Sequence, residues 1–458
     1  MSILTMRPFA SSMTVSSILF PGADGIPGAE PERDPPFFGD LHLDAIADKL
    51  FAGRDAYNLR PFFRFALRTT EAITYRQEAM RDFERCDVLA EITAFAESMR
   101  VTREARAQSA RLSYACERER WTLDAANVYC DCVERISKAL IELPIASRGL
   151  HAFRDYLVSY LQSADYRMLV EGLVSAREEL AAISYAVSID GDLLSVRDPS
   201  GERDLVAAIH DTFARFRKSD AKSYLLASRE HPGMNHIEAK VLEFVALLHP
   251  GAFAKLSAFE REHGDFTDAV IERFDREVQF YIASIEYARF FEAAGLPMCF
   301  PQVDLGRMVF AEETFDAALA QRLIDGGAEV VQNNFALKGK ERVFVVSGPN
   351  QGGKTTFART FGQLHYLAAL GCRVPGGRVT VGVFDAMFTH FERQEDPAAL
   401  RGKLEDDLMR IHDILKCATP QSIIILNEIF ATTTVRDATD LAERIMNRIL
   451  ELDARCLC

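Results

Sequence analysis

A glycine-rich segment in the last quarter of the chain constrains its fold more than any other feature. Residues 348–355 read Gly-Pro-Asn-Gln-Gly-Gly-Lys-Thr, which satisfies the phosphate-binding (Walker A) pattern G-x-x-x-x-G-K-[ST]. The apolar run at residues 343–346 predicts a short buried strand before the loop. Residues 356–370 have helical spacing, and Gly371 is placed to end that helix. Strand, glycine loop and helix in this order predict an α/β domain built around the loop.

Each residue type in the loop suits the binding of phosphate. Backbone N–H groups and the helix N-terminus face the anion, the lysine neutralises charge and the hydroxyl reaches Mg²⁺. We therefore expect Lys354 to contact phosphate and Thr355 to contact Mg²⁺. The expected nucleotide-binding residues are Gly348, Pro349, Asn350, Gln351, Gly352, Gly353, Lys354, Thr355 and Thr356.

A phosphate loop requires a second strand that brings polar groups to the metal and to the attacking water. Residues 422–426 read Ser-Ile-Ile-Ile-Leu and predict that buried strand, with Asn427 and Glu428 at its C-terminal end. We expect Glu428 to orient or deprotonate water and to act with Lys354 as the catalytic pair. Asn427 stands beside Thr355 as a metal-site residue, where an aspartate is usual, and its amide carries no charge.

The length of the chain, 458 residues, exceeds an ordinary single core and predicts several domains. Residues 1–39 end in a stretch rich in Pro, Gly, Glu and Asp, which predicts an arm or linker. Residues 40–300 have helical spacing almost throughout, interrupted by a hairpin signal at Asp190-Gly191. Residues 301–458 alternate short strands with helices and predict an α/β domain with a mostly parallel sheet.

One long helix is predicted within the helical block. From Asp268 to Ala294 apolar residues recur every three or four positions, and Gly295 and Pro297 end the pattern. At 1.5 Å per residue this helix spans on the order of 40 Å. It is either a lever that carries motion between distant sites or a long core helix, and the sequence favours neither.

Composition limits how the chain can bind nucleic acid and indicates its cellular compartment. The formal net charge of −14 argues against coating of nucleic acid irrespective of its sequence, but a local basic groove would still bind phosphates. Residues 62–65 and 213–218 mix basic and aromatic side chains, and we favour an amphipathic helix over base stacking for both. No signal peptide and no membrane-spanning run is found, and the scattered cysteines predict reduced thiols. We therefore expect a cytoplasmic protein.

The sequence around the loop resembles one family. The opening Gly348-Pro349-Asn350 is narrower than the general loop pattern. The similarity continues through Gly371, Pro375, Gly382, Asp385, Phe388, Thr389, Asn427, Glu428, Ile429 and Asp437. Residues 348–437 thus resemble the ATPase domain of the MutS family of DNA mismatch-repair proteins. Residues 40–300 are similar, more weakly, to the core and lever region that precedes that domain.

The resemblance implies a multidomain fold, in which an all-α core and lever region precedes a P-loop ATPase domain of the ABC/MutS type. It implies binding and hydrolysis of Mg²⁺–ATP, coupled to binding of double-stranded or branched DNA in repair or recombination. It also implies a homodimer. Nothing before the helical block resembles the family's mismatch-recognition module.

The sequence departs from the family's pattern at positions that matter for hydrolysis, and these departures leave an alternative function open. Asn427 stands where the family has Asp. Residues 400–404, with Gly402 among them, stand where the family has the Gly-x-Ser-Thr-Phe segment that reaches across the dimer to the partner's γ-phosphate. Residues 454–458 look like the start of another strand, so we expect the ATPase domain to be C-terminally incomplete. The alternative is a nucleotide-gated DNA-binding or scaffold protein with little or no ATP turnover. An ATPase related to transporters or chromosome-maintenance proteins is disfavoured, because their Ser-Gly-Gly-Gln signature is not found.

Overall fold

The computed structural model describes residues 17–22, 25–26, 32–190, 193–199, 234–349, 352–392, 403–430 and 435–458. The chain divides into two compact units. Unit 1 contains Met1–Thr93, Ala139–Tyr156 and Ala269–Cys458, and unit 2 contains Ala94–Lys138 and Leu157–Asp268. The first and the last parts of the chain therefore share unit 1. The predicted domain boundaries at residues 40 and 301 stay predictions.

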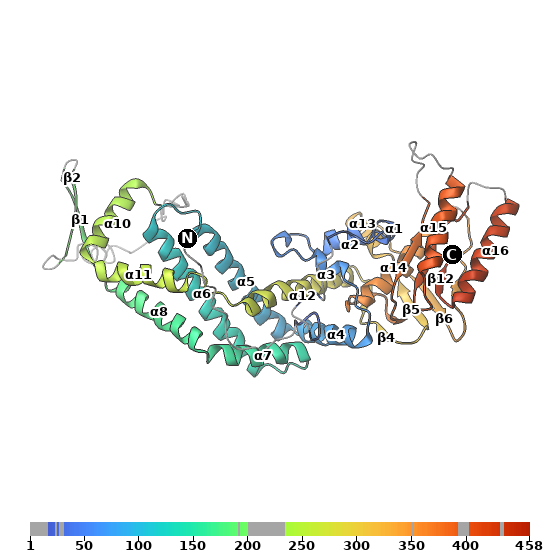
Figure 1. Ribbon diagram of the computed structural model, residues 1–458, viewed down its shortest axis with the longest axis horizontal. Helices are drawn as coiled ribbons and strands as arrows, with labels where there is room; N and C mark the ends of the chain where they lie inside the picture. Colours follow the sequence, from blue (N-terminus) through green and yellow to red (C-terminus); the bar gives the residue numbers. More distant parts are fainter. Residues whose placement is uncertain are drawn as a thin grey trace, which may run out of the picture. The chain divides into compact units, whose positions relative to one another are not determined.

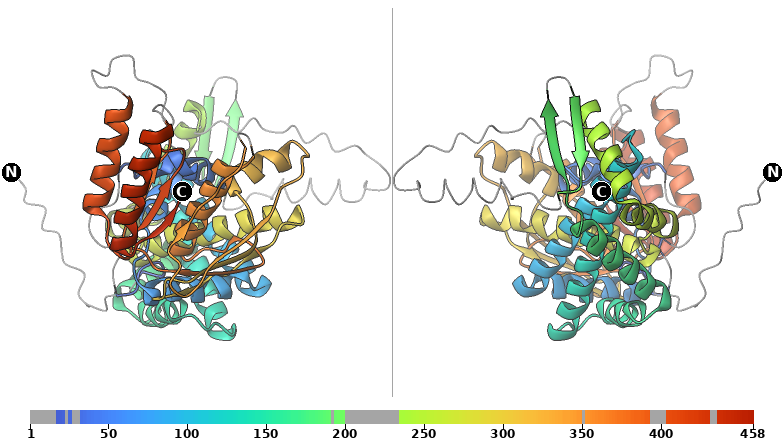
Figure 2. Two further views of the ribbon diagram at one scale, coloured as in Figure 1. Left: turned by 90° about the vertical axis from the view of Figure 1, so that its right-hand side faces the viewer. Right: turned by 90° about the vertical axis from the view of Figure 1, so that its left-hand side faces the viewer.

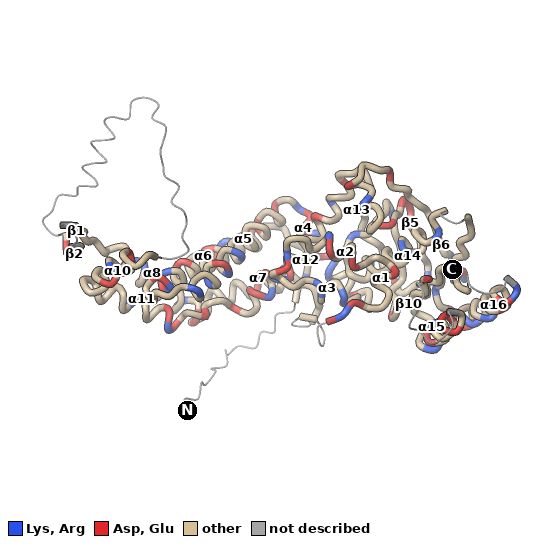
Figure 3. Tube along the Cα trace, turned by 90° about the horizontal axis from the view of Figure 1, so that it is seen from above, with Lys and Arg blue, Asp and Glu red and all other residues tan. Residues whose placement is uncertain are grey.

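Unit 2 is built mainly from helices. Its helical segments come from α5 (Cys86–Ser109), α6 (Ala115–Glu142), α7 (Arg148–Leu161), α8 (Ala164–Ala181), α10 (His236–Leu248) and α11 (Pro250–His263). α8 and α11 approach closely at Gly172, where an added Cβ atom would lie 3.3 Å from the Phe259 ring. Figure 3 shows acidic and basic residues interspersed along α5 and α6. Arg100, for example, pairs with Glu97 and Glu104 on the exposed side of α5.

The hairpin predicted at Asp190-Gly191 is confirmed. β1 (Ala186–Asp190) pairs antiparallel with β2 (Leu193–Arg197), and Asp190 stands opposite Leu193 (Figure 2). Residues 213–218, which mix basic and aromatic side chains, lie outside the described residues. Across the part of the chain that the structure describes, no single helix is long and apolar enough to cross a membrane. α10 and α11, bent by 107° at their junction, meet the criteria of length and composition only as a pair.

Unit 1 contains one long helix, α12 (Ala269–Ala293), as the sequence predicts. The others from the N-terminal part are α1 (Phe37–Leu41), α2 (Leu43–Leu50), the short 3₁₀ turn η1 (Asp55–Tyr57), α3 (Arg60–Arg64) and α4 (Thr70–Glu84). α12 packs against α2 and α4. Consecutive residues of α12 from Glu277 to Ile285 are buried, so α12 is a core helix of unit 1. Gly295, with φ of 76°, ends it, and the Leu296 N–H donates to the Phe291 carbonyl. The lever interpretation stays a prediction.

A parallel four-stranded sheet carries the predicted site. Its order is β10 (Met387–His390), β11 (Ile423–Leu426), β12 (Arg455–Leu457) and β7 (Val343–Phe344). α14 (Lys354–Ala369) follows β7, α15 (Lys403–Cys417) connects β10 to β11, and α16 (Val435–Leu452) connects β11 to β12. α15 and α16 lie beside β12 (Figure 1). The strand predicted at residues 454–458 is thus confirmed. It separates the glycine-loop strand β7 from β11, which precedes Asn427.

The second sheet of unit 1 differs from the prediction of a mostly parallel sheet. Its order is β4 (Gln302–Asp304), β9 (Arg378–Gly382), β5 (Val309–Thr314) and β6 (Asn333–Leu337). Only the β4–β9 pair is parallel. Residues 305–308 between β4 and β5 are too few for a crossover, so β5 runs back antiparallel. β3 (Met298–Cys299) and β8 (Val374–Pro375) form a small antiparallel pair, and α13 (Ala317–Asp325) follows β5.

The strand before the glycine loop is shorter than predicted. The sequence indicates a buried strand over residues 343–346, but β7 contains only Val343 and Phe344, and Val345 is 73% exposed. Within the described residues β7 is an edge strand, paired with β12 on one side only. The Val346 N–H still donates to the Cys458 carbonyl at 2.7 Å, which keeps the approach to the loop aligned with β12.

Candidate nucleotide-binding site

The glycine loop lies at the N-terminal end of α14 and depends on its glycines. Gly353 caps α14 with φ of 86°, in the left-handed region that favours glycine. The Gly352 N–H donates to the Pro349 carbonyl at 3.1 Å, and a Cβ on Gly352 would lie 2.9 Å from the same oxygen. A side chain at either position would therefore displace the turn. Asn350 and Gln351 lie outside the described residues.

Lys354 folds back onto the loop that precedes it. Its Nζ atom donates to the carbonyl oxygens of Gly348 at 3.0 Å and Pro349 at 3.1 Å. The same atom lies 3.9 Å from Oε1 of Glu428, which follows β11. The structure thus brings together the two residues that the sequence predicts as the catalytic pair, although they are far apart in the chain.

The C-terminal end of β11 places the second half of the site. All of Ile423, Ile424, Ile425 and Leu426 are buried, as the sequence predicts. The Asn427 N–H donates to the His390 carbonyl at 2.8 Å, and the Thr355 hydroxyl donates to Oδ1 of Asn427 at 3.3 Å. The predicted metal-site pair is therefore in direct contact. Thr356 lies one position further along α14 and is half-buried.

The backbone turns sharply after Asn427. Glu428 has φ of 55° and Phe430 has φ of 61°, both in the left-handed region that non-glycine residues rarely occupy. Phe430 is 1% exposed and packs in the core between α15, α16 and β12. Packing of this ring compensates for the unfavourable backbone, and it holds Glu428 at the surface with its side chain 40% exposed.

Two hydrogen-bonded side-chain pairs on β10, beside the site, were not predicted from the sequence. His390, at the end of β10, contacts Oδ1 of Asp407 on α15 through its Nε2 atom at 3.1 Å. Burial, followed by Arg410, lowers the pKa of His390, while Asp407 opposes that shift. The Thr389 hydroxyl donates to Oδ2 of Asp40 at 2.6 Å. One sequence signal existed for Asp407, because its position in α15 falls on the same side of the helix as the apolar residues Leu404 and Ile411.

His365 on α14 makes folding stability sensitive to acid. Its ring is fully buried, its Nδ1 atom faces the Phe361 carbonyl at 2.8 Å, and burial followed by Arg455 lowers its pKa to about 3. An unfolded histidine takes up a proton near pH 6.5 and the folded one does not, so stability falls as pH decreases from about 6.5 toward 3. We expect His365→Gln to remove up to about 1.4 kcal/mol of this loss per pH unit. Urea unfolding of both proteins at several pH values measures it, and equal pH dependence would contradict it.

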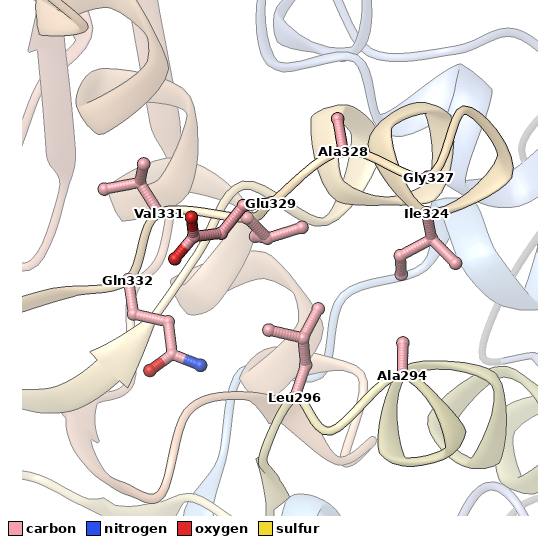
Figure 4. Close-up of a pocket in the computed structure, with 9 residues that line it drawn as sticks. Ala294, Leu296, Ile324, Gly327, Ala328, Glu329, Val331 and Gln332 are labelled. Atoms are coloured by element: carbon pink, nitrogen blue, oxygen red, sulfur yellow. The ribbon is translucent and has the colours of Figure 1, made fainter.

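A separate cavity of about 630 Å³ lies between the end of α12 and the segment from α13 to β6. Figure 4 shows Leu296 and Ile324 at this cavity together with Glu329 and Gln332. Its lining includes one carboxylate and no lysine or arginine, so it does not suit phosphate. None of the predicted site residues lines it.

Comparison with known proteins bears directly on the part of the chain that contains this site. The family model described as MutS domain V matches residues 344–458, from the end of β7 through β12. Residues 344–458 are therefore similar to MutS domain V. The resemblance found in the sequence is thereby confirmed for its C-terminal part.

Two curated relatives match the same region. The DNA mismatch repair protein MutS of Shouchella clausii (strain KSM-K16) is 33% identical over 121 residues, which cover 26% of this chain and 14% of that protein. The DNA mismatch repair protein MutS of Zymomonas mobilis subsp. mobilis is 32% identical over 136 residues, which cover 30% of this chain and 16% of that protein. The matched region thus spans less than a fifth of the length of either relative.

Proposed function

We propose that the chain binds Mg²⁺–ATP at the glycine loop and hydrolyses it. The observation that carries this proposal is the contact between the two halves of the site. Lys354 lies 3.9 Å from Glu428, and Thr355 is hydrogen-bonded to Asn427. Phosphoryl transfer requires a cation at the phosphates, a hydroxyl near the metal and a carboxylate for the water. The order of the parallel sheet and the similarity to MutS domain V support an ATPase domain of the ABC/MutS type.

The residues present fit this nucleotide. Gly352 and Gly353 bring the loop backbone to the N-terminus of α14, where the helix dipole favours an anion. Lys354 donates to two loop carbonyls, and phosphate oxygens can replace these as acceptors. Mg²⁺ prefers oxygen ligands, and the Thr355 hydroxyl and the Asn427 amide oxygen provide them. Among the described residues no cluster of three or more His, Cys, Asp or Glu side chains forms another metal site.

The mechanism assigns a separate role to each side chain. When bound, Mg²⁺–ATP would supply the phosphoryl group to be transferred and a metal ion whose positive charge offsets the negative charge of the phosphates. Glu428 orients the attacking water and accepts its proton, and its exposure gives water access to the carboxylate. Lys354 and the loop N–H groups stabilise the negative charge that develops. Asn427 holds the Thr355 hydroxyl in position.

A second candidate is a nucleotide-gated DNA-binding or scaffold protein with little or no turnover. Asn427 favours it, because the contact between Asn427 and Thr355 is neutral on both sides and adds no charge for the metal. ATP would then be bound at the same loop and released slowly, with its presence rather than its hydrolysis controlling DNA binding.

Asn427→Asp separates the two candidates. Because a carboxylate adds negative charge beside the metal, we expect the steady-state ATPase rate to rise by about tenfold or more if wild-type turnover is limited here. Gln421→Glu makes the same change in charge at an exposed position before β11 and should leave the rate unchanged. Turnover that Asn427→Asp does not alter counts against the low-turnover candidate.

DNA, double-stranded or branched, is the proposed partner, and a homodimer in the cytoplasm is the proposed state. The two relatives are named as DNA mismatch repair proteins, which supports DNA as the partner. Because the net charge is −14, binding must rest on local basic groups and should weaken steeply with salt. Titration of duplex, branched and mismatched DNA, with and without ATP and across salt concentrations, tests this. The absence of binding to all of them at low salt would overturn the DNA part of the proposal.

A further inference from the structure

Four residues near the N-terminus are buried in unit 1, although the sequence places them in an arm or linker. We call Ser17, Ile18, Leu19 and Phe20 the N-terminal strap. None of them is more than 2% exposed. The strap belongs to no helix or strand, so its backbone groups depend on side chains for hydrogen bonds. The Leu19 and Phe20 N–H groups donate to the Ser17 hydroxyl within the strap, and side chains of α4 and α12 bind the strap's carbonyl groups.

α12 binds the first half of the strap. The carboxylate of Glu277 is fully buried and accepts hydrogen bonds from the Ser17 hydroxyl at 2.6 Å and the Ile18 N–H at 2.8 Å. The Tyr281 hydroxyl donates to the Ile18 carbonyl at 2.6 Å, and the Tyr75 hydroxyl of α4 donates to the Ser17 carbonyl at 2.9 Å. A buried carboxylate is costly unless donors surround it. The strap supplies those donors to Glu277.

Arg76 of α4 binds the second half of the strap and also the end of α14. Its fully buried guanidinium donates to the Leu19 carbonyl through Nε at 3.3 Å and Nη2 at 3.2 Å. Its Nη1 donates to the carbonyl of Leu370, the C-cap of α14, at 2.9 Å. The guanidinium carbon lies 4.9 Å from the centre of the Phe20 ring. One side chain therefore joins the strap to α14.

The fit around Arg76 is close on the side of α14. Gly371 has φ of 69°, and an added Cβ there would lie 3.1 Å from Cβ of Arg76. The opposite end of α14 begins at Lys354, directly after the glycine loop. A displacement of Arg76 would therefore act on the same rigid helix that presents the predicted phosphate site.

We propose that the strap is a docked peptide that ties α12 to the C-terminal end of α14, with Arg76 as the joint. Undocking of the strap loosens the last turn of α14 and weakens nucleotide binding at its first turn. This last consequence rests on the proposed function. Docking of the strap and loosening of α14 do not.

The first test cuts the strap free in the folded, full-length protein. A protease recognition sequence is placed between residues 22 and 32 and cleaved after purification. The N-terminal fragment should co-elute with the rest of the protein in size-exclusion chromatography. It should separate when Ser17 and Phe20 are both replaced by alanine. Separation of the wild-type fragment as readily as the variant fragment overturns docking.

The second test uses the Arg76→Lys variant of the uncut chain. Lysine keeps the positive charge, but its single ammonium group cannot reach the carbonyls of Leu19 and Leu370 together. Hydrogen–deuterium exchange should rise about tenfold or more at residues 367–372, at the end of α14, and at residues 277–281 of α12. It should stay unchanged in α16. The control is Arg448→Lys, the same substitution at an exposed position of α16. Unchanged exchange at residues 367–372 in Arg76→Lys overturns the tie.

Nucleotide affinity is then measured on two cut proteins: the wild type, which should retain the fragment, and the Ser17→Ala/Phe20→Ala variant after its fragment has separated. We expect loss of the strap to weaken Mg²⁺–ATP binding about fivefold or more, and equal affinities overturn the coupling to the loop. If the uncut wild-type protein binds no ATP, the proposed function fails. The chromatography and the exchange measurements still decide the strap in that case.

Discussion

Replacement of Lys354 by alanine is expected to weaken Mg²⁺–ATP binding by the full chain about 100-fold or more and to abolish hydrolysis. The Nζ atom of Lys354 already lies at the loop, 3.0 Å from the Gly348 carbonyl and 3.1 Å from the Pro349 carbonyl. Hydrogen bonds between a lysine and phosphate are charge-assisted and contribute on the order of 1.5–3 kcal/mol each, so the loss of two accounts for this factor. Titration with a fluorescent ATP analogue measures it.

A matched control separates the loop from the general charge of the protein. Lys340→Ala removes an exposed lysine shortly before β7 and should leave ATP affinity unchanged. Thermal unfolding of both variants checks that the fold is retained. Hydrolysis that survives Lys354→Ala in the full-length protein would contradict the proposed site.

Glu428→Gln is expected to lower the turnover number about 100-fold to 1,000-fold while ATP binding is retained. The glutamine keeps the shape of the side chain but cannot accept a proton from the attacking water, and general-base catalysis is worth roughly two to four orders of magnitude. Single-turnover hydrolysis together with equilibrium binding measures the two effects separately.

The control for Glu428→Gln is Glu443→Gln, an exposed glutamate on α16 that should leave both quantities unchanged. The 3.9 Å approach of Glu428 to Lys354 permits a small change in affinity, because the charge of a neighbour is removed. A loss of binding as large as the loss of turnover would show that Glu428 holds the nucleotide, and would contradict its assignment to the water.

Elements with a regular apolar pattern were predictable from the sequence. α12, α14 and β11 match their predicted positions closely, because side-chain periodicity of three to four or a continuous apolar run determines them locally. The β1–β2 hairpin likewise follows from the local turn signal at Asp190-Gly191. The antiparallel second sheet was not predicted, since the pairing of short strands depends on which partners the whole fold brings together.

The candidate site was predictable in its parts but not in its support. Lys354, Thr355, Asn427 and Glu428 follow from motif and strand position, and the structure brings all of them together. The left-handed backbone at Glu428 has no sequence signal, because it is imposed by burial of a later residue.

The contacts that hold the N-terminal part of unit 1 to the rest are long-range and depend on single side chains. Ser17 binds Glu277 across 260 positions, and Asp40 binds Thr389 across 349 positions. Neither contact repeats along an element, so no periodicity reveals it. The short apolar run at Ile18-Leu19-Phe20 is the one local hint, and such a run is equally compatible with an exposed arm.

Isothermal titration of the full-length protein with ATP, in the presence and absence of Mg²⁺, tests the central claim most directly. We predict saturable binding at one site per chain, tightened by Mg²⁺ and lost in Lys354→Ala. The absence of binding by the wild-type protein at millimolar ATP, or binding that Lys354→Ala leaves unchanged, would contradict nucleotide binding at this loop.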